Sequence, residues 1–361
     1  MRNIVTIILI LVYSSAFSQA TQELNISTAN QYSTIDSLAK TVKYNGDLAM
    51  LTDQLTKGSK TELEKARALF IWITHNIAYD YKLFNKKKNK RKSFKCKKNI
   101  NCDAEYAEWK SNYVKKIITK GKGICSGYAS LFEEMCKNAG IQCSIVSGYI
   151  KDSPGEIGKM GILDHAWNVM LIDGKYYFLD ATWAAGYVPE KRNGKPKGFR
   201  FMYNDYYWLT SIDKLSRNHF PKDSVWIKNT TYTKAKANYK NTAYIKSNYL
   251  AYTNVLSPDT GVLNIKTGDT IHFEIACSKN ISYIQAVANY DDYKTPQEIK
   301  DSGKEWNEEE IKKQKYLPFK KEGDIYYFNV IANNKNLRFY DIFFDHQQVL
   351  RFKINTIKSL K

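Results

Sequence analysis

The 361-residue sequence lacks the motifs that define several large classes of enzyme and binding protein. No HExxH motif occurs and no two cysteines have zinc-finger spacing, so we predict no metal site. A glycine-rich phosphate loop and a dinucleotide fingerprint are also missing, and we therefore expect no cofactor. Beyond the first residues, no apolar run is long enough to predict a transmembrane helix.

Acidic residues are scarce beside basic ones, with 36 Asp and Glu against 55 Lys and Arg and a net charge of +19. The excess is densest in Lys82–Lys98, which holds ten Lys or Arg and no acid. Such a run suits an anionic partner, such as an acidic glycan or a lipid headgroup, but also an ordinary solvated insertion. Because Phe84 and Phe94 are its only aromatic residues and they are not interleaved regularly with the basic ones, we do not expect the run to bind nucleic acid.

The first residues have the pattern of a secretory signal peptide. Arg2 supplies the positive end, and Ile4–Val12 is an apolar run too short to span a bilayer. Small residues follow, and we place cleavage between Ser18 and Gln19, which predicts a secreted or periplasmic protein. No cysteine lies at this junction, so we do not expect a lipoprotein anchor. An uncleaved N-terminal anchor is the alternative.

The predicted export makes disulfides possible among the six cysteines, since disulfides form outside the cytosol. Cys96 and Cys102 lie close together in the lysine-rich stretch, where a small disulfide staple is plausible. Cys136 and Cys143 bracket a predicted helix end and strand start, a spacing compatible with a disulfide or with two buried thiols. Cys277 stands alone in the C-terminal region.

The length of the chain favours two domains, and 43% hydrophobic residues suffice for two cores. After the signal peptide at 1–18, we predict a first domain at 19–227 that begins with helices. A Lys- and Asn-rich stretch at 228–247 is the predicted linker. Short alternating segments separated by turn residues then predict a β-sandwich at 248–361.

Cys125 lies where a new helix is expected to begin, just after the glycines at 121 and 123. A helix N-terminus favours the thiolate, which is the reactive form of the side chain. The N–H groups there are also placed to hold an oxyanion during acyl transfer. A small buried core cysteine fits this segment alone equally well.

A hairpin is predicted downstream, with strands at 165–172 and 175–182 around the two-residue turn Asp173-Gly174. Side chains alternate between the two faces of a strand, so the length of the turn decides which face each residue of the second strand occupies. One additional residue in the turn would move every side chain of the second strand, including that of Asp180, to the other face of the hairpin.

In the two-residue register, Trp167 faces Asp180, and His165 is the diagonal neighbour of Asp180 on the same face. Such neighbours lie roughly 7–8 Å apart along the backbone, a gap that a histidine and a carboxylate can close. If the helix with Cys125 packs on that face, the thiol meets the imidazole, in the order nucleophile, base and orienter. The alternative is a structural Asp–His pair beside an inert thiol.

Three segments of the chain carry a family resemblance. Lys122–Ala129 surrounds the cysteine, Asp164–Val169 surrounds the histidine, and Gly174–Trp183 surrounds the aspartate. Together they resemble the transglutaminase-like superfamily, in which the three residues occur in the same chain order.

Further segments are similar to one branch of that superfamily, the kyphoscoliosis-peptidase-like proteins. Lys65–Asp80 resembles the upstream helix of the branch, and His219–Pro221 resembles its closing segment. Ser257–Gly261 resembles the start of a C-terminal immunoglobulin-like domain, although this match is weaker. The resemblance covers most of the chain from about residue 45.

The resemblance implies an α+β fold with a papain-like transglutaminase core, in which a helix bearing Cys125 packs on an antiparallel sheet bearing His165 and Asp180. It also implies an all-β immunoglobulin-like sandwich after this core. The implied chemistry is acyl transfer through a thioester on Cys125, ending in hydrolysis or in attack by an amine. No residue matches a side-chain oxyanion donor, which leaves the backbone N–H of Cys125.

Two hypotheses of different class follow. The first is an exported cysteine peptidase or amidase, or a transglutaminase with the same site, acting on a protein or peptide. Hydrolysis is favoured over cross-linking because nothing in the sequence excludes water from the thioester. The second is a non-catalytic envelope- or surface-associated binding protein that retains the fold. The complete set Cys125, His165 and Asp180 favours the enzyme.

Overall fold

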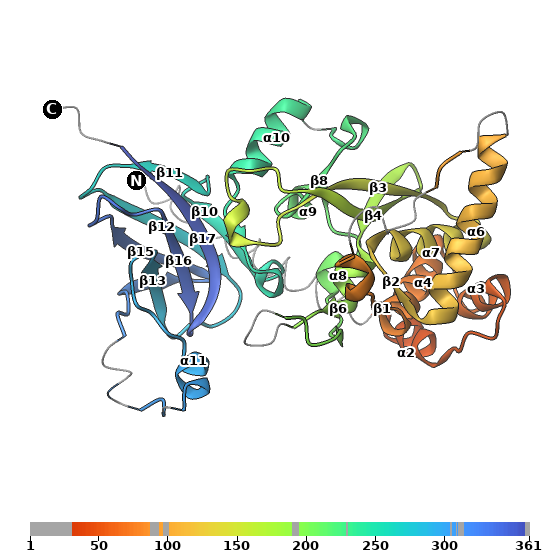
Figure 1. Cartoon of the computed structure of the whole chain (residues 1–361), viewed down its shortest axis with the longest axis horizontal. Helices are drawn as coiled ribbons and strands as arrows, with labels where there is room; N and C mark the ends of the chain where they lie inside the picture. Colours follow the sequence, from red (N-terminus) through yellow and green to blue (C-terminus); the bar gives the residue numbers. More distant parts are fainter. Residues whose placement is uncertain are drawn as a thin grey trace, which may run out of the picture. The chain divides into compact units, whose positions relative to one another are not determined.

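In the computed structural model, the described residues are 31–86, 94–96, 101–189, 195–228, 230–303, 305–307, 309 and 314–357. They fall into two compact units, and each is described by itself (Figure 1). Unit 1 contains the described residues of Met1–Val146 and His165–Ser211. Unit 2 contains those of Ser147–Asp164 and Ile212–Lys361.

The first part of unit 1 is helical, and one more helix follows its β-hairpin. In chain order these helices are α2 (Ser33–Thr41), α3 (Leu48–Thr56), α4 (Glu62–Asn76), α5 (Tyr81–Phe84), α6 (Cys102–Lys120), α7 (Cys125–Asn138) and α8 (Ala181–Ala185). Local chemistry sets their ends. Thr61 and Glu64 form a reciprocal capping box before α4. Gly121 adopts φ 57°, which lets the chain leave α6 and turn toward α7.

The strands of unit 1 are short apart from one hairpin. They are β1 (Ala78–Tyr79) parallel to β2 (Lys122–Gly123), β4 (Leu163–Ile172) antiparallel to β5 (Lys175–Leu179), β6 (Gly186–Tyr187) antiparallel to β7 (Arg200–Phe201), and the first part of β3 (Gln142–Ile150). The predicted turn is confirmed, since Ile172 pairs with Lys175 and both turn residues have positive φ. The predicted extension of the second strand to Thr182 is wrong, because Asp180 caps helix α8 and ends the strand at Leu179.

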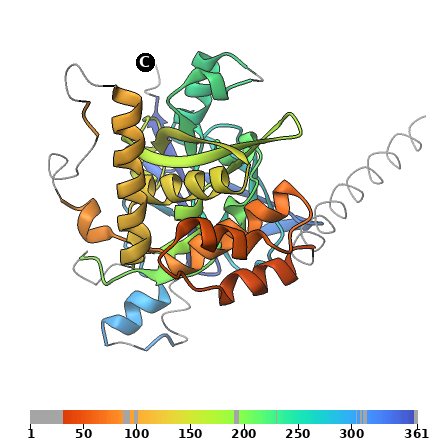
Figure 2. The ribbon, with the colours of Figure 1, turned by 90° about the vertical axis from the view of Figure 1, so that its right-hand side faces the viewer.

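The core of unit 1 lies around α4, which packs against α2, α3, α7 and α8. Phe70 of α4 meets Phe132 of α7 edge to face at 6.3 Å, and both side chains are fully buried. Helix α6 crosses α7 on the outer side of the unit (Figure 2). The two helices approach closely at Gly127, where an added Cβ would lie 2.9 Å from the Ile117 side chain. Helix α7 is therefore held from two sides.

Unit 2 is mostly β-structure. Its helical elements are η2 (Pro154–Glu156), α9 (Ile212–Leu215), η4 (Ser224–Trp226), α10 (Tyr232–Asn241), η5 (Ser247–Tyr249) and α11 (Pro296–Asp301). One sheet has the order β10 (Thr253–Ser257), β12 (Thr270–Cys277), β15 (Ile325–Ile331), β14 (Phe319–Glu322). The other has the order β11 (Val262–Ile265), β17 (Gln347–Thr356), β16 (Phe339–Phe344), β13 (Ile284–Ala288), with β9 (Tyr244–Ile245) also on β17. Apart from these, β8 (His219–Pro221) pairs with the end of β3.

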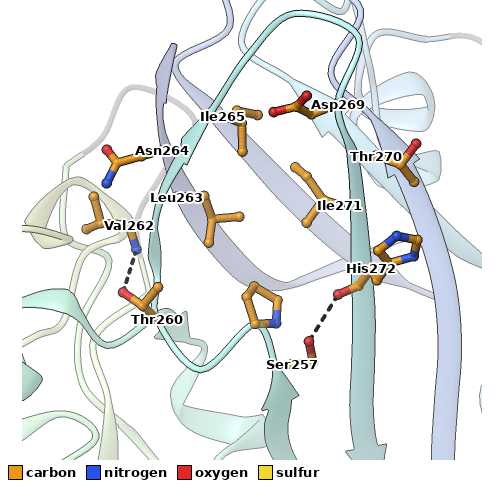
Figure 3. A pocket seen from close by; sticks show the side chains of 11 residues that line it. Ser257, Thr260, Val262, Leu263, Asn264, Ile265, Asp269, Thr270, Ile271 and His272 are labelled. Carbon is orange, nitrogen blue, oxygen red and sulfur yellow. Dashed lines mark hydrogen bonds between the residues drawn. The ribbon is translucent and has the colours of Figure 1, made fainter. Parts of the chain in front are cut away.

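The two sheets enclose an apolar core. Alternate residues of β12 are buried, and Phe273 among them meets Phe352 of the facing sheet at 5.0 Å. The predicted alternating segments thus appear as β12, β13, β15 and β17. At one side a hollow of about 670 Å³ separates β11 from β12, and Leu263, Ile265 and Ile271 point into it (Figure 3).

Several predictions concern the linker, the domain boundaries or residues that the structure does not describe. The predicted linker at 228–247 contains helix α10 and strand β9, while the predicted domain boundaries stay a prediction. The predicted signal peptide at 1–18 lies outside the described residues, as do 87–93 and 97–100 of the Lys82–Lys98 run. Within the described part of the chain, no helix has the length and apolarity needed to cross a bilayer.

Candidate active site

Cys125 is the first residue of helix α7, as the glycine pattern predicted. The residue before it, Ile124, has extended backbone and provides no side-chain cap, so no side chain of the N-cap competes for the helix N-terminus. The thiol is buried, with 5% of the residue exposed, and it forms no disulfide.

His165 and Asp180 form a hydrogen-bonded pair on the hairpin, as the predicted register required. The Nε2 atom of His165 lies 2.7 Å from Oδ2 of Asp180, and both residues are buried. The other carboxylate oxygen, Oδ1, accepts the backbone N–H groups of Thr182 and Trp183 at 2.8 and 3.1 Å. Because Asp180 also caps α8, its carboxylate cannot rotate freely, and it fixes the orientation of the imidazole.

The imidazole has a second side-chain partner, which is the thiol of Cys125. Since Nε2 is engaged by Asp180, Nδ1 is the nitrogen left for the sulfur. The structure therefore brings together all three residues that the sequence singled out, in the order thiol, imidazole, carboxylate. That order is the arrangement of an activated nucleophile with its base and orienter.

The charge state of the site follows from its burial and its partners. Burial disfavours the imidazolium, but the charge and hydrogen bond of Asp180, with a smaller part from Cys125, raise the pKa of His165 to about 10. The histidine is therefore protonated at neutral pH.

Two tryptophans flank the imidazole and were not singled out from the sequence. Trp167 stacks against His165 with ring centres 5.9 Å apart, and Trp183 lies tilted at 5.7 Å. Their rings pack on the imidazole and restrict its rotation. A signal was present, since Trp167 follows His165 by two residues on the same strand face, and Trp183 follows Asp180 by one helical turn.

Hydrogen bonds tie the hairpin and the helices into one frame. Asn168 of β4 donates its side-chain N–H to the carbonyl of Ala129 in α7 at 3.0 Å. Tyr128 of α7 donates its hydroxyl to the carbonyl of Ile77, just after α4. Both donors are buried. The first bond fixes the helix that bears Cys125 against the strand that bears His165, and the second fixes the same helix against the end of α4.

Thiol, imidazole and carboxylate groups are also metal ligands in other proteins. Here the imidazole hydrogen-bonds to both other groups, which is the arrangement that proton transfer needs. The expectation of no cofactor and no metal stays a prediction.

The sequence neighbours of the chain agree with this geometry. Residues 90–181, which include all three site residues, match the family model of the transglutaminase-like superfamily. Human kyphoscoliosis peptidase is 33% identical over 198 residues, which are 54% of this chain and 26% of that protein. This chain contains a transglutaminase-like domain, and over about half of its length it is similar to kyphoscoliosis peptidases.

More distant relatives of this transglutaminase-like domain are similar over the same share of the chain. Hillarin of Drosophila melanogaster is 24% identical over 208 residues, 54% of this chain and 23% of that protein. A solved structure described as a TGase is 16% identical and covers 55% of this chain and 42% of that one, with a TM-score of 0.28. The chain spans about a quarter of the length of kyphoscoliosis peptidase and of hillarin. The activity of either whole protein therefore does not follow for this chain.

Proposed function

We propose that the protein is an exported cysteine acyl-transfer enzyme, a peptidase or amidase, with Cys125 as nucleophile, His165 as acid and base, and Asp180 as orienter. One observation carries the proposal: the imidazole of His165 is hydrogen-bonded to both the thiol and the carboxylate in a buried site. A thiol with only a structural role would not require a protonated imidazole whose orientation is fixed by a helix-capping carboxylate.

The proposed reaction proceeds in two halves. The Cys125 thiolate attacks the carbonyl carbon of a peptide or side-chain amide, and the N–H groups at the start of α7 stabilise the oxyanion. His165 gives its proton to the leaving amine as the C–N bond breaks, which leaves a thioester on Cys125. Neutral His165 then takes a proton from water, hydroxide adds to the thioester, and the carboxylic acid leaves as the thiolate re-forms. An amine in place of water would give a cross-link.

The location belongs to the same proposal. The leader at residues 1–18 supports export, and the disulfide between Cys96 and Cys102 fits an oxidising compartment. Mass spectrometry of the mature protein from a cell that expresses the full chain tests this. We expect an N-terminus at Gln19, and a retained leader in the cytosolic fraction would exclude export.

The catalytic proposal is tested by the rate of iodoacetamide labelling of Cys125 between pH 5 and 9, read by mass spectrometry of the peptide. We expect labelling below pH 7 in the wild type and in the control Cys277→Ala, because the thiolate is stabilised by protonated His165. His165→Ala should label only at higher pH, near the ordinary pKa of a thiol. Cys125→Ala should remove both this labelling and amide cleavage.

A Cys125 that labels with the same pH profile in wild type and His165→Ala would contradict the proposal. That outcome would favour the other hypothesis, a non-catalytic binding protein with the same fold.

A further inference from the structure

Helix α6 carries a stripe of stacked aromatic rings that the proposed mechanism does not use. Tyr106, Trp109 and Tyr113 are spaced three and four residues apart and so share one face of the helix. The rings of Tyr106 and Trp109 stack at 6.0 Å and 20°, and those of Trp109 and Tyr113 at 5.2 Å and 11°. Tyr106 is 42% exposed, and the other two are half-buried. Contiguous exposed apolar surface marks interaction sites more often than single exposed apolar residues do.

A separate segment extends the stripe. Phe94 packs on Tyr106 at 5.3 Å and on Trp109 at 6.0 Å. Two residues later, Cys96 forms a disulfide with Cys102, the first residue of α6. The disulfide therefore holds Phe94 close to the rings of the helix, and we call Phe94, Tyr106, Trp109 and Tyr113 the aromatic stripe.

The aromatic stripe leads to the nucleophile. At its end the hydroxyl of Tyr113 lies 3.1 Å from the hydroxyl of Ser126, the residue that follows Cys125. The close approach of α6 and α7 at Gly127 fixes this junction. A chain that presents a carbonyl to Cys125 and lies along α6 would therefore run over these rings.

The stacking geometry selects the kind of occupant. Sugars, nucleobases and cations bind aromatic residues through an open ring face. Here Trp109 has Tyr106 on one face and Tyr113 on the other, while the edge-on ring of Phe94 packs against Tyr106. The stripe thus presents mainly ring edges and tyrosine hydroxyls, which suit the apolar side chains and backbone groups of a polypeptide.

We propose that the aromatic stripe is a specificity site that binds apolar side chains of a polypeptide whose amide reacts at Cys125. The inference rests on the proposed function, since it names the substrate class of that same site. It assigns to Trp109, at the centre of the stripe, the largest share of the selectivity.

The test uses two peptides that each carry a chloroacetylated lysine as electrophile, one flanked by Leu and Phe and the other flanked by Gly. The readout is the ratio of their rates of Cys125 alkylation, which cancels any change in the reactivity of the thiol itself. We expect the wild type to prefer the Leu/Phe peptide by roughly 10- to 200-fold, the range that apolar pockets provide. Trp109→Ser should bring the ratio close to one, and Trp109→Phe should keep part of it.

Tyr176→Ser is the matched control, because Tyr176 is a 46% exposed aromatic residue near the turn of the hairpin, away from Asp180. It should keep the wild-type ratio. The double variant Cys96→Ser, Cys102→Ser should lower the ratio by releasing Phe94, with circular dichroism confirming the fold of each variant.

Two failures are distinguishable. Wild-type alkylation at Cys125 with no preference between the peptides, or a preference that Trp109→Ser leaves intact, overturns the specificity site alone. No alkylation of Cys125 by either peptide or by iodoacetamide overturns the proposed function and the specificity site with it.

Discussion

The two units bury positive charge in different ways. In unit 1, Arg67 and His165 are each hydrogen-bonded to carboxylates: Arg67 to Asp36 and Asp205, and His165 to Asp180. In unit 2, the buried ammonium of Lys151 donates to the backbone carbonyls of Tyr239 and Thr242 at 2.8 Å. A carboxylate supplies a full opposite charge, whereas carbonyls supply only dipoles.

The consequence is an inverted order of basicity. Burial lowers the pKa of Lys151 to about 7, and the more distant Glu156 offsets this only in part. Burial acts on His165 in the same direction, yet its carboxylate partner raises the pKa to about 10. A histidine in unit 1 thus holds its proton more tightly than a lysine in unit 2. The difference shows that the partner, and not the residue type, decides the charge of a buried group.

The two groups give opposite dependences of stability on pH. The folded pKa of His165 lies above its ordinary 6.5, so its contribution is complete below pH 6.5 and is lost as the pH rises through about 10. The folded pKa of Lys151 lies below its ordinary 10.5. Between about pH 7 and 10.5 the unfolded chain therefore binds the extra proton, and unit 2 gains stability as the pH rises.

The largest effect is expected from Asp180→Asn, which removes the carboxylate from the His165 pair. Asparagine still caps α8, so the helix should remain. Burial is then opposed only by the smaller contribution of Cys125, and the pKa of His165 should fall well below its wild-type value. We expect any amide cleavage at pH 7 to fall by roughly 10⁴-fold, the scale known for such a change in a catalytic triad. Alkylation of Cys125 should fall less, by roughly 30-fold, because an ordinary thiol is still partly thiolate at pH 7.

The pH at which the imidazole titrates, followed by NMR of its ring protons, measures the cause directly. A His165 that still titrates near pH 10 in Asp180→Asn would show that the carboxylate does not set its charge.

The next effect is expected from Arg67→Leu, which leaves Asp36 without its bidentate partner. Arg67 is 3% exposed, but the side chains of Asp36 and Asp205 are 18% and 49% exposed. Water can therefore solvate the carboxylates that remain, and we expect a loss below the about 3–5 kcal/mol typical of a fully buried pair. Urea unfolding with pulse labelling of the buried thiols Cys136 and Cys277 reports on units 1 and 2 separately. We expect Cys136 to become reactive at lower urea. The exposed pair of Lys320 with Glu322 supplies the control, and Lys320→Leu should leave both transitions in place.

The smallest effect is expected from Lys151→Met, read by the same labelling of Cys277 at several pH values. In the wild type, the Lys151 side chain should add at most about 1.4 kcal/mol of stability per pH unit between pH 7 and 10.5. The variant should lose this slope, and also about 1–3 kcal/mol from the unsatisfied carbonyls of Tyr239 and Thr242. Equal slopes in the two proteins would mean that Lys151 keeps its ordinary pKa.

Much of the site could be predicted from local chemistry. A two-residue turn has a fixed register, so Asp173-Gly174 was enough to place His165 and Asp180 on one face of the hairpin. Glycines before Cys125 were enough to place it at a helix start. The end of β5 was missed because Asp180 begins a helix there, and the capping of α8 competes with strand pairing in a way that periodicity does not reveal.

The sequence by itself was enough to single out Cys125, His165 and Asp180 and to predict the face of the hairpin that the last two share, because these depend on turns and periodicity within short segments. Only the tertiary structure decided that the thiol reaches the imidazole, since α7 is positioned by packing against α4, α6 and the hairpin. It also decided that Trp167 and Trp183 flank His165 and that aromatic residues of α6 lead to Cys125. The physical reason is that burial and neighbouring charge are properties of the assembled fold, and they set the pKa of His165.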